Sequence, residues 1–141
     1  MIQEYQVSGF RVREYEELRS TNTEAERVGW DELEDKMVIL TYKQTQGRGQ
    51  VGNHWESEPG KNISMTVVFK PRELPAGQQF AVSMVIALGA CDFISRYVAG
   101  CTVKWPNDIY VGDRKISGIL IEHSIMGRYV GGSLCGIGVN I

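Results

Sequence analysis

The sequence predicts an α+β fold, a mixed or largely antiparallel sheet with helices packed on one face. Short apolar runs of strand length occupy residues 37–43 and 62–71, and a long apolar segment at helical spacing follows at 78–98. From residue 101 onward, strand-like runs alternate with glycine turns. At 141 residues the chain has the length of one domain and can bury a proper core.

The first half of the chain predicts strands around one short helix. Residues 10–18 alternate apolar and polar side chains for part of their length, as a half-buried strand does. Ser20 or Thr21 is suited to cap the N-terminus of a helix that ends at Gly29. The runs 37–43 and 62–71 are rich in β-branched residues and are expected to be buried strands.

The second half predicts a long helix followed by a strand meander. Turns are expected at 112–113 and 126–127, each at a glycine. The long helix should cover the sheet with a stripe of apolar side chains at helical spacing, namely Phe80, Met84, Ala87, Leu88, Cys91 and Ile94.

Composition excludes several classes of function. A net charge of -2 and a pI of about 5.7 give no basic surface for nucleic acid, so no DNA partner is expected. No signal peptide is evident, and no run approaches the ~20 apolar residues of a membrane span, which predicts a cytoplasmic protein without a membrane partner. The three cysteines lack paired spacing and are expected to be reduced thiols, and the two isolated histidines give no metal-ligand pattern.

The stretch QTQGRGQVG, residues 44–52, is the least ordinary loop in the chain. Gly47, Gly49 and Gly52 follow a predicted buried strand, and Arg48 lies between the first two. Exposed N–H groups of such a loop can form an anion site, and glycine lets a ligand approach the backbone closely. The stretch matches neither the P-loop nor the dinucleotide-binding pattern. Its spacing alone fits a flexible surface loop as well as an anion site.

Two further stretches contain candidate polar groups. In KWPND, Pro106 sets a turn that displays Asn107 and Asp108 toward a hard cation or a polar ligand, although an ordinary turn bonded to its own backbone fits equally. In GIGVN, glycines inside a strand followed by Asn140 indicate a bulge or a close approach by a ligand.

Lys115 lies at the start of the alternating stretch ISGILIE. Strict alternation places Lys115 and Ser117 on one face of the strand, opposite a face that holds Ile116, Gly118, Leu120 and Glu122. A single strand lysine is most often solvated, so its position by itself indicates no role.

Taken together and in order, five motifs closely resemble the catalytic domain of biotin–protein ligases, the biotin–[acetyl-CoA-carboxylase] ligases of the biotin/lipoate ligase superfamily. The motifs are STN at 20–22, QTQGRGQVG at 44–52, KWPND at 104–108, RKISGIL at 114–120 and GIGVN at 136–140. The resemblance implies a ligase core like that of class II aminoacyl-tRNA synthetases. It also implies that biotin and ATP, with Mg²⁺, form biotinyl-5′-AMP, whose acyl group passes to a lysine of a biotin carboxyl carrier protein. A homodimer is compatible with the resemblance.

The resemblance also implies roles for individual residues. Lys115, which would bridge the biotin carboxylate and the α-phosphate, and Arg48 would be catalytic. The implied biotin-binding residues are Ser20, Thr21, Asn22, Gln44, Gly47, Arg48, Gly49, Gln50, Lys115, Gly118, Leu120 and Gly136. The implied ATP and Mg²⁺ residues are Arg48, Asn107, Asp108, Lys115 and Asn140, with Asp108 as the Mg²⁺ ligand.

The chain departs from the family pattern at Gln50, where the repressor-ligases carry arginine. Loss of that cation could weaken retention of the adenylate, and Lys43 or Arg48 could compensate. The resemblance further implies that the catalytic domain is incomplete at its C-terminal end, without a C-terminal β-barrel and without an N-terminal DNA-binding domain. Two alternatives stay open: a lipoate ligase or octanoyltransferase relative, and a non-catalytic biotin-binding remnant.

Overall fold

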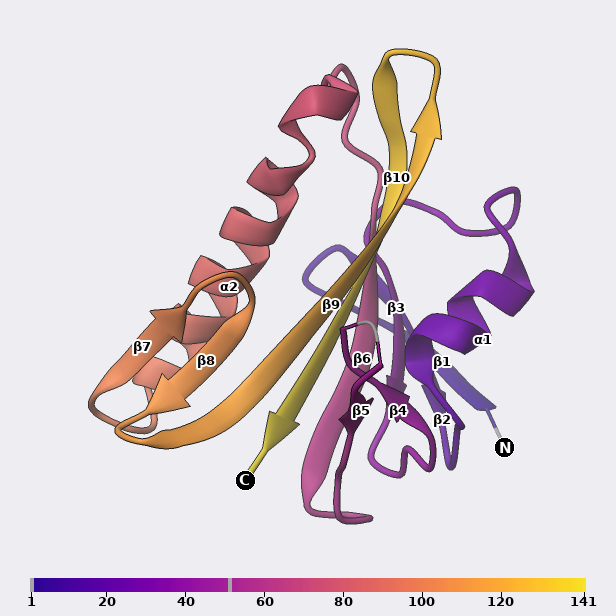
Figure 1. The fold of residues 1–141 in the computed structure, drawn as a ribbon. Helices are drawn as coiled ribbons and strands as arrows, with labels where there is room; N and C mark the ends of the chain where they lie inside the picture. Colours follow the sequence, from indigo (N-terminus) through magenta and orange to yellow (C-terminus); the bar gives the residue numbers. More distant parts are fainter. Residues whose placement is uncertain (1, 51) are drawn as a thin grey trace.

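A computed structural model describes residues 2–50 and 52–141 as a large twisted sheet flanked by two α-helices (Figure 1). The strands are β1 (Ile2–Val7), β2 (Phe10–Tyr15), β3 (Met37–Thr41), β4 (Gly47–Arg48), β5 (His54–Trp55), β6 (Asn62–Phe69), β7 (Cys101–Lys104), β8 (Asp108–Val111), β9 (Arg114–Met126) and β10 (Tyr129–Asn140). The helices are α1 (Thr21–Val28) and α2 (Phe80–Ser95), with a 3₁₀ turn at Ala76–Gln78.

Eight strands form the main sheet in the order β1-β2-β3-β6-β10-β9-β8-β7. Every neighbouring pair is antiparallel except β2 and β3, which are parallel and are joined through α1. A parallel pair requires such a crossover, because a tight turn leaves the next strand antiparallel to the one before it. The predicted mixed, mostly antiparallel sheet is confirmed, and β4 and β5 form a separate small hairpin.

The edge strand β1 has no counterpart in the prediction. It pairs with β2 through a turn at Ser8 and Gly9, whose positive φ angles of 49° and 83° suit a two-residue hairpin. Most of its side chains are exposed, so it lacks the buried face that makes a strand visible in a sequence.

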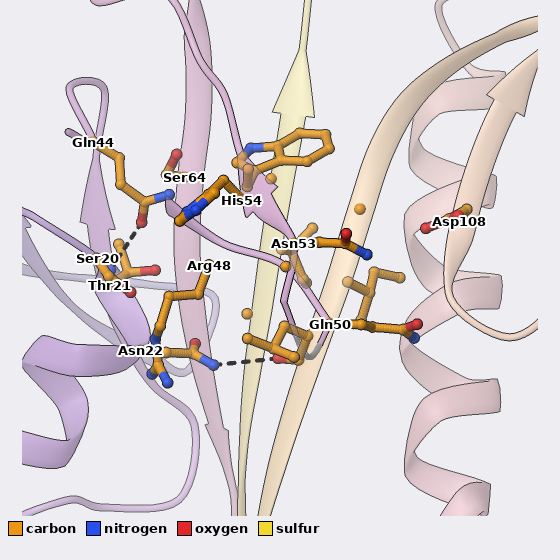
Figure 2. Close-up of a pocket in the computed structure, with 18 of the residues that line it drawn as sticks. Ser20, Thr21, Asn22, Gln44, Arg48, Gln50, Asn53, His54, Ser64 and Asp108 are labelled. Carbon is orange, nitrogen blue, oxygen red and sulfur yellow. Dashed lines mark hydrogen bonds between the residues drawn. The ribbon is translucent and has the colours of Figure 1, made fainter. Parts of the chain in front are cut away.

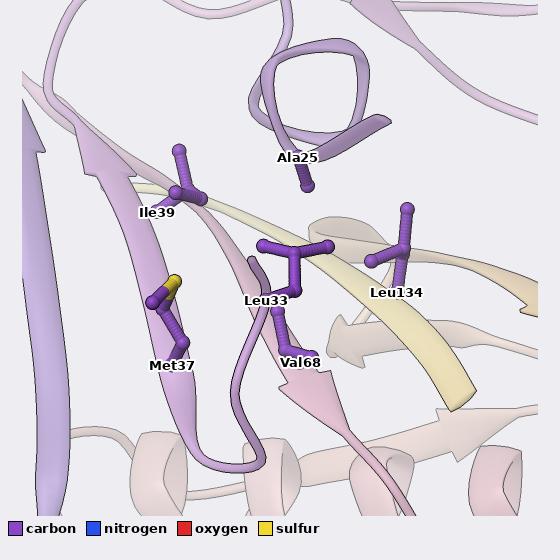
Figure 3. Packing of buried hydrophobic residues seen from close by; sticks show 6 residues of the cluster. All are labelled: Ala25, Leu33, Met37, Ile39, Val68 and Leu134. Atoms are coloured by element: carbon purple, nitrogen blue, oxygen red, sulfur yellow. The ribbon is translucent and has the colours of Figure 1, made fainter. Parts of the chain in front are cut away.

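The two helices lie on opposite faces of the sheet, which corrects the predicted placement of the helices on one face. Alternating side chains of the central strands divide between them. One core, shown in Figure 3, packs under α1 and consists of Ala25, Leu33, Met37, Ile39, Val68 and Leu134. The other packs under α2 and consists of Ala87, Ile94, Ile109, Ile119, Ile137 and Val139. Apolar runs in the central strands reflect burial on both faces, which a one-sided reading of the sequence misses.

The orientation of α2 also differs from the prediction. Of the predicted stripe, Ala87, Cys91 and Ile94 pack toward the sheet, whereas Met84 and Leu88 are 50% and 61% exposed. Because the helix is apolar on all sides, periodicity could not select the buried face.

The expectation of no membrane-length apolar run also needs correction. The helical stretch Ala76–Ser95 is 20 residues long and apolar enough, by length and composition, to cross a membrane. Val82, Ala87 and Ile94 of this helix are buried, whereas Met84, Val85 and Leu88 are at least half exposed.

The cysteines are free thiols, as expected. Cys135 is buried in β10, and burial raises the pKa of its thiol to about 12. Cys91 of α2 and Cys101 of β7 lie with their sulfur atoms 3.0 Å apart.

Candidate active site

A pocket of about 260 Å³ opens on the α1 face of the sheet. It lies between the N-terminus of α1, the β4–β5 hairpin and the middle of β9 and β10 (Figure 2). This volume is slightly below the roughly 300–1,000 Å³ of small-molecule sites. The lining residues are Ser20, Thr21, Asn22, Gln44, Arg48, Gly49, Gln50, Asn53, His54, Trp55, Ser64, Asp108, Lys115, Gly118, Ile119, Leu120, Gly136, Ile137 and Gly138.

The first wall is the start of α1, where three consecutive polar residues are almost fully buried. Ser20 is the N-cap, and its hydroxyl accepts a hydrogen bond from the backbone N–H of Thr23 at 3.3 Å. The backbone N–H of Thr21 donates to Oε1 of Gln44 at 2.9 Å. The predicted helix start is confirmed, and its cap orders the side chains that face the pocket.

The orientation of the Asn22 amide is fixed by its surroundings. Its Nδ2 donates to the carbonyl oxygen of Leu120 at 3.3 Å and to Oε1 of Glu122 at 3.0 Å. Its Oδ1 contacts the buried hydroxyl of Thr66. The Thr66 hydroxyl also lies 2.8 Å from the hydroxyl of Thr21. Since a hydroxyl has one proton, Thr66 donates to Asn22 and accepts from Thr21. The pocket is therefore bordered by a polar network in which hydrogen bonds within the protein fix which groups donate and which accept.

The second wall is the glycine stretch, which is folded as the β4–β5 hairpin. Gly47 pairs with Trp55, and a Cβ at residue 47 would collide with the backbone oxygen of Trp55. The N–H of Gly49 donates to the carbonyl of Asn53 at 3.0 Å, and the N–H of Asn53 donates to Gln50 at 2.8 Å. These two amides are used inside the hairpin, so they do not form an anion cradle in this conformation.

Arg48 ties this hairpin to the opposite walls. Its Nη2 donates to Oε1 of Glu26 in α1 at 3.1 Å and to Oε1 of Glu122 in β9 at 2.8 Å. Burial, and then the proximity of Glu122, raise the pKa of Glu26. Burial also acts to raise the pKa of Glu122, but hydrogen bonds from Asn22 and Glu26, with the charge of Arg48, outweigh it and lower that pKa. Of the two carboxyl groups, Glu122 is therefore the one with the lowered pKa.

Lys115 points into the pocket, which corrects the strict alternation expected for its strand. The register of β8 with β9 shifts by one residue, because Ile109 faces Ser117 while Tyr110 faces Lys115. Such a bulge re-aims the neighbouring side chain. Ile116 consequently packs toward the α2 core, and Lys115 joins Gly118 on the pocket face.

Two groups engage the Lys115 ammonium. Its Nζ lies 2.9 Å from Oδ1 of Asp108 and 5.5 Å from the centre of the Trp55 ring. A carboxylate and an aromatic face both attract an ammonium group. The KWPND turn thus supplies the counter-ion of Lys115.

Trp55 forms the floor of the pocket, where it lies across two glycines. A Cβ at Gly118 would lie 2.9 Å from its ring, and a Cβ at Gly138 would overlap its Nε1. Its buried Nε1 has no hydrogen-bond partner among the described residues.

The pocket unites most of the predicted site residues. It includes Ser20, Thr21, Asn22, Gln44, Arg48, Gly49, Gln50, Asp108, Lys115, Gly118, Leu120 and Gly136. Gly47 and Asn140 line an adjoining, wider cavity of about 1250 Å³, which shares Arg48 and Trp55 with the first. Asn107 lines neither, and its carbonyl accepts from the N–H of Ile119 at 3.1 Å.

Sequence reasoning missed seven lining residues: Asn53, His54, Trp55, Ser64, Ile119, Ile137 and Gly138. A signal existed for Trp55, since a tryptophan soon after a glycine loop is a large side chain that must pack on something. Gly138 was recognised as a strand glycine, and the indole is what approaches it.

The described residues contain no group of three or more His, Cys, Asp or Glu that could hold a metal ion. Asp108 offers a single carboxylate, already paired with Lys115. Mg²⁺ is commonly held by one or two carboxylates together with substrate phosphates. The donor set thus fits a metal ion that is bound largely by the phosphates of a nucleotide, and it does not form a metal cage of its own.

Comparison with known proteins agrees with this geometry. The family model described as biotin/lipoate A/B protein ligase matches residues 15–140, almost the whole chain. The chain belongs to this family. The match includes every lining residue of the pocket, so the family assignment applies to the site as well as to the fold.

Named relatives narrow the comparison to biotin ligases. A biotin–[acetyl-CoA-carboxylase] ligase of Paracoccus denitrificans is 34% identical over 124 residues, which is 86% of this chain and 51% of that protein. The bifunctional ligase/repressor BirA of Bacillus subtilis is 27% identical over 137 residues, 96% of this chain and 42% of the relative. The chain thus spans about half the length of these relatives, or less.

Solved structures show the same fold with ligands. The biotin acetyl coenzyme A carboxylase synthetase of Helicobacter pylori, with bound biotinylated ATP, gives a TM-score of 0.74 at 29% identity, covering 92% of this chain and 60% of that one. The biotin protein ligase of Leishmania major with biotinyl-5-AMP gives 0.71 at 26% identity, covering 92% and 57%.

Proposed function

We propose that this chain is the catalytic core of an ATP-dependent biotin–protein ligase. The observation that supports this most is the pocket itself. It combines a buried polar wall at 20–22, a glycine-lined floor at Trp55 and the cation of Lys115 beside Asp108. A small ligand with a polar ring at one end and a carboxylate at the other matches these features.

In this proposal the polar wall recognises the ureido ring of biotin. The hydroxyls of Ser20 and Thr21 and the amide of Asn22 are held by the helix cap and by Thr66, so their orientation costs little on binding. Gly118 and Gly136 let Trp55 and Asn22 lie close against the strands, the pocket beside them would take the ring system and the valeryl chain, and Lys115 lies where the carboxylate would end.

The reaction would have two steps, adenylation of biotin and transfer of the biotinyl group. A carboxylate oxygen of biotin attacks the α-phosphorus of ATP, and the bond to the β-phosphate bridging oxygen breaks, giving biotinyl-5′-AMP and pyrophosphate. The amine of a carrier-protein lysine next attacks the acyl carbon, AMP leaves with the bonding electrons, and the amine loses a proton. Lys115 would hold the carboxylate and the α-phosphate together and stabilise the charge on the phosphorus oxygens. Mg²⁺, bound mainly by the ATP phosphates, would neutralise further charge, with Asp108 as its protein ligand.

Gln50 affects the proposed retention of the adenylate, because it stands where the repressor-ligases carry an arginine. Both residues that could compensate are engaged in ion pairs, Lys43 with Glu17 at 2.5 Å and Arg48 with Glu26 and Glu122. Either would need to leave its carboxylate to reach a phosphate. We infer that adenylate retention in this chain depends mainly on Lys115.

The decisive experiment combines ligand binding with turnover. Calorimetry with biotin and with lipoate separates the two branches of the family, and tighter binding of lipoate would contradict the proposal. Incubation with biotin, MgATP and a biotin carboxyl carrier domain should release pyrophosphate and add the mass of biotin to the carrier. Biotin binding without any biotin-dependent pyrophosphate release would favour the non-catalytic alternative.

Lys115→Ala is the matching variant. It should lower adenylation by about 10²–10³-fold, as removal of one preorganised donor to a charged transition state does, and leave biotin affinity largely intact. Lys104→Ala is the control, because Lys104 lies over the Tyr110 ring and does not line the pocket. Equal adenylation by Lys115→Ala and Lys104→Ala would exclude the assigned role.

A further inference from the structure

One carboxylate oxygen joins two walls of the pocket. Oε1 of Glu122 accepts a hydrogen bond from Nδ2 of Asn22 at 3.0 Å and from Nη2 of Arg48 at 2.8 Å. Asn22 lies in the first turn of α1 and Arg48 belongs to the glycine hairpin, whereas Glu122 lies on β9 of the main sheet. The resemblance assigns no role to Glu122, and it lies just beyond the lining of the pocket.

The contact between Glu122 and Asn22 is important for stability because Asn22 is buried. Asn22 is 3% exposed, and its Oδ1 is already engaged by Thr66. Its two amide protons are therefore left for the Leu120 carbonyl and for Glu122. Loss of the Glu122 acceptor would leave a buried donor unsatisfied, and an unsatisfied buried group is costly to the fold. The amide would then be held by Thr66 and the Leu120 carbonyl alone, so its donor and acceptor pattern toward the pocket would be less firmly fixed.

The second partner decides where the hairpin rests. Arg48 is 38% exposed and the Glu122 side chain 34%, so their ion pair alone would be weak in solvent. The pair is strengthened because Asn22 orients the same oxygen that Arg48 uses. Figure 2 shows the Arg48 side chain running toward Asn22 and away from Asp108, so the hairpin is fastened at the α1 end of the pocket.

Glu26 is the other carboxylate on Arg48, but it fits a lesser role. It accepts from Arg48 at 3.1 Å, and its pKa is raised by burial and by Glu122. It makes no contact with Asn22 among the hydrogen bonds of the described residues. Among the hydrogen bonds of the described residues, Glu122 is the carboxylate that contacts both Arg48 and Asn22.

We propose that Glu122 is a positioning residue for the biotin pocket: its Oε1 sets the Asn22 amide and holds the glycine hairpin through Arg48. This inference rests on the proposed function, because the ligand it serves is biotin. It also predicts that Arg48 must leave Glu122 before its guanidinium can reach a phosphate, so the same contact restrains the hairpin before the nucleotide is bound.

Graded variants separate the acceptor from the charge. Glu122→Gln keeps an acceptor oxygen of the same reach and loses the charge, whereas Glu122→Leu removes both. Glu122→Leu should weaken biotin binding by about 10- to 100-fold, the equivalent of one lost hydrogen bond to a charged group. Glu122→Gln should recover a substantial part of this loss. Glu32→Gln is the matched control, because Glu32 forms a similar pair with Arg13 at 3.0 Å, outside the pocket lining.

A ligand-free readout keeps this test independent of the proposed function. Trypsin cleaves after arginine, and the Arg48–Gly49 bond is protected while the side chain is held in two ion pairs. The rate of cleavage at Arg48, relative to that at Arg72 in the exposed loop after β6, should rise about tenfold in Glu122→Leu and stay unchanged in Glu32→Gln. The melting temperature identifies any variant that has simply lost its fold.

Each outcome has a defined meaning. An unchanged cleavage ratio in folded Glu122→Leu overturns the proposal, whatever happens to biotin. A raised ratio with unaltered biotin affinity also overturns it, because the contact would then hold the hairpin without serving the ligand. If folded wild type binds no biotin while the cleavage ratio still rises, the proposed function has failed and Glu122 is reduced to a structural restraint. Partial rescue by Glu122→Gln in both readouts supports the positioning role.

Discussion

Strand β10 has two faces with opposite character. The residues that face α2 are Ser133, Cys135, Ile137 and Val139, and all of them are buried. The residues that face α1 and the pocket include Gly132, Gly136 and Gly138. On the α2 side this strand supplies side chains for packing, while on the α1 side it supplies Leu134 to the core and otherwise glycines, which let Trp30, Asn22 and Trp55 approach the backbone.

The two faces of the sheet serve two purposes. The α2 face stabilises the strands by apolar burial, and its chemistry tolerates exchange between aliphatic residues. The pocket face positions polar and aromatic groups at the backbone, and a single added methyl group would displace them. Stability and ligand recognition should therefore respond to different substitutions on the same strands.

The largest effect should come from the α2 core. Ile94→Ala removes a side chain that is 3% exposed and should lower the free energy of unfolding by about 2–5 kcal/mol. Leu88→Ala on the outer side of α2 should change it by no more than about 0.5 kcal/mol. Urea denaturation of both variants tests this. A similar loss in the two would show that the outer side of α2 is covered in solution, which would break the comparison.

The second effect should appear on the pocket face. A Cβ at Gly136 would lie 2.6 Å from Oδ1 of Asn22 and 3.0 Å from the Leu120 carbonyl oxygen. Gly136→Ala should therefore cost about 1–3 kcal/mol by overpacking, and biotin affinity should fall with it because Asn22 is displaced.

Gly89→Ala is the control for this substitution. Gly89 lies within α2 with nothing near its missing Cβ, so alanine there should stabilise the protein by up to about 1 kcal/mol. Calorimetry with biotin and thermal unfolding measure both quantities. Gly136→Ala with full biotin affinity would show that close approach at this glycine does not shape the pocket.

The same contrast explains how far the sequence could be read. Helix α1 is predictable because Ser20 is a local start signal and Gly29 a local stop signal, and the strands after residue 100 are predictable from glycine turns. The face of α2 was not, since an apolar helix gives no direction. The bulge that turns Lys115 inward was also invisible, because it depends on the pairing of β9 with β8.

In the site, too, local motifs are predictable from the sequence, and contacts that depend on tertiary structure are not. The five motifs predict most of the pocket residues, because the resemblance assigns a role to those positions. Trp55 and Asn53 were missed because their place depends on the folding back of the β4–β5 hairpin. Glu122 was assigned to a strand face correctly, but its shared oxygen becomes evident only when α1, the hairpin and β9 meet.

The smallest effect should come from a polar residue on the α2 face. Nδ1 of His123 lies 2.7 Å from the hydroxyl of the buried Ser133, and burial lowers the pKa of His123 below its ordinary 6.5. A lowered histidine pKa means that the unfolded chain binds a proton more readily than the folded one. Its contribution to stability is therefore complete above about pH 6.5 and is lost as the pH falls through that value.

The expected loss is well below about 1.4 kcal/mol, the equivalent of one pKa unit, since the ring is only partly shielded from solvent. Unfolding of wild type and His123→Asn between pH 7.5 and 5.0 gives the difference, and the NMR shift of the ring proton gives the pKa directly. A His123 pKa above 6.5 would mean that a nearby carboxylate, rather than burial, dominates. The α2 face would then be less apolar beside β9 than its packing indicates.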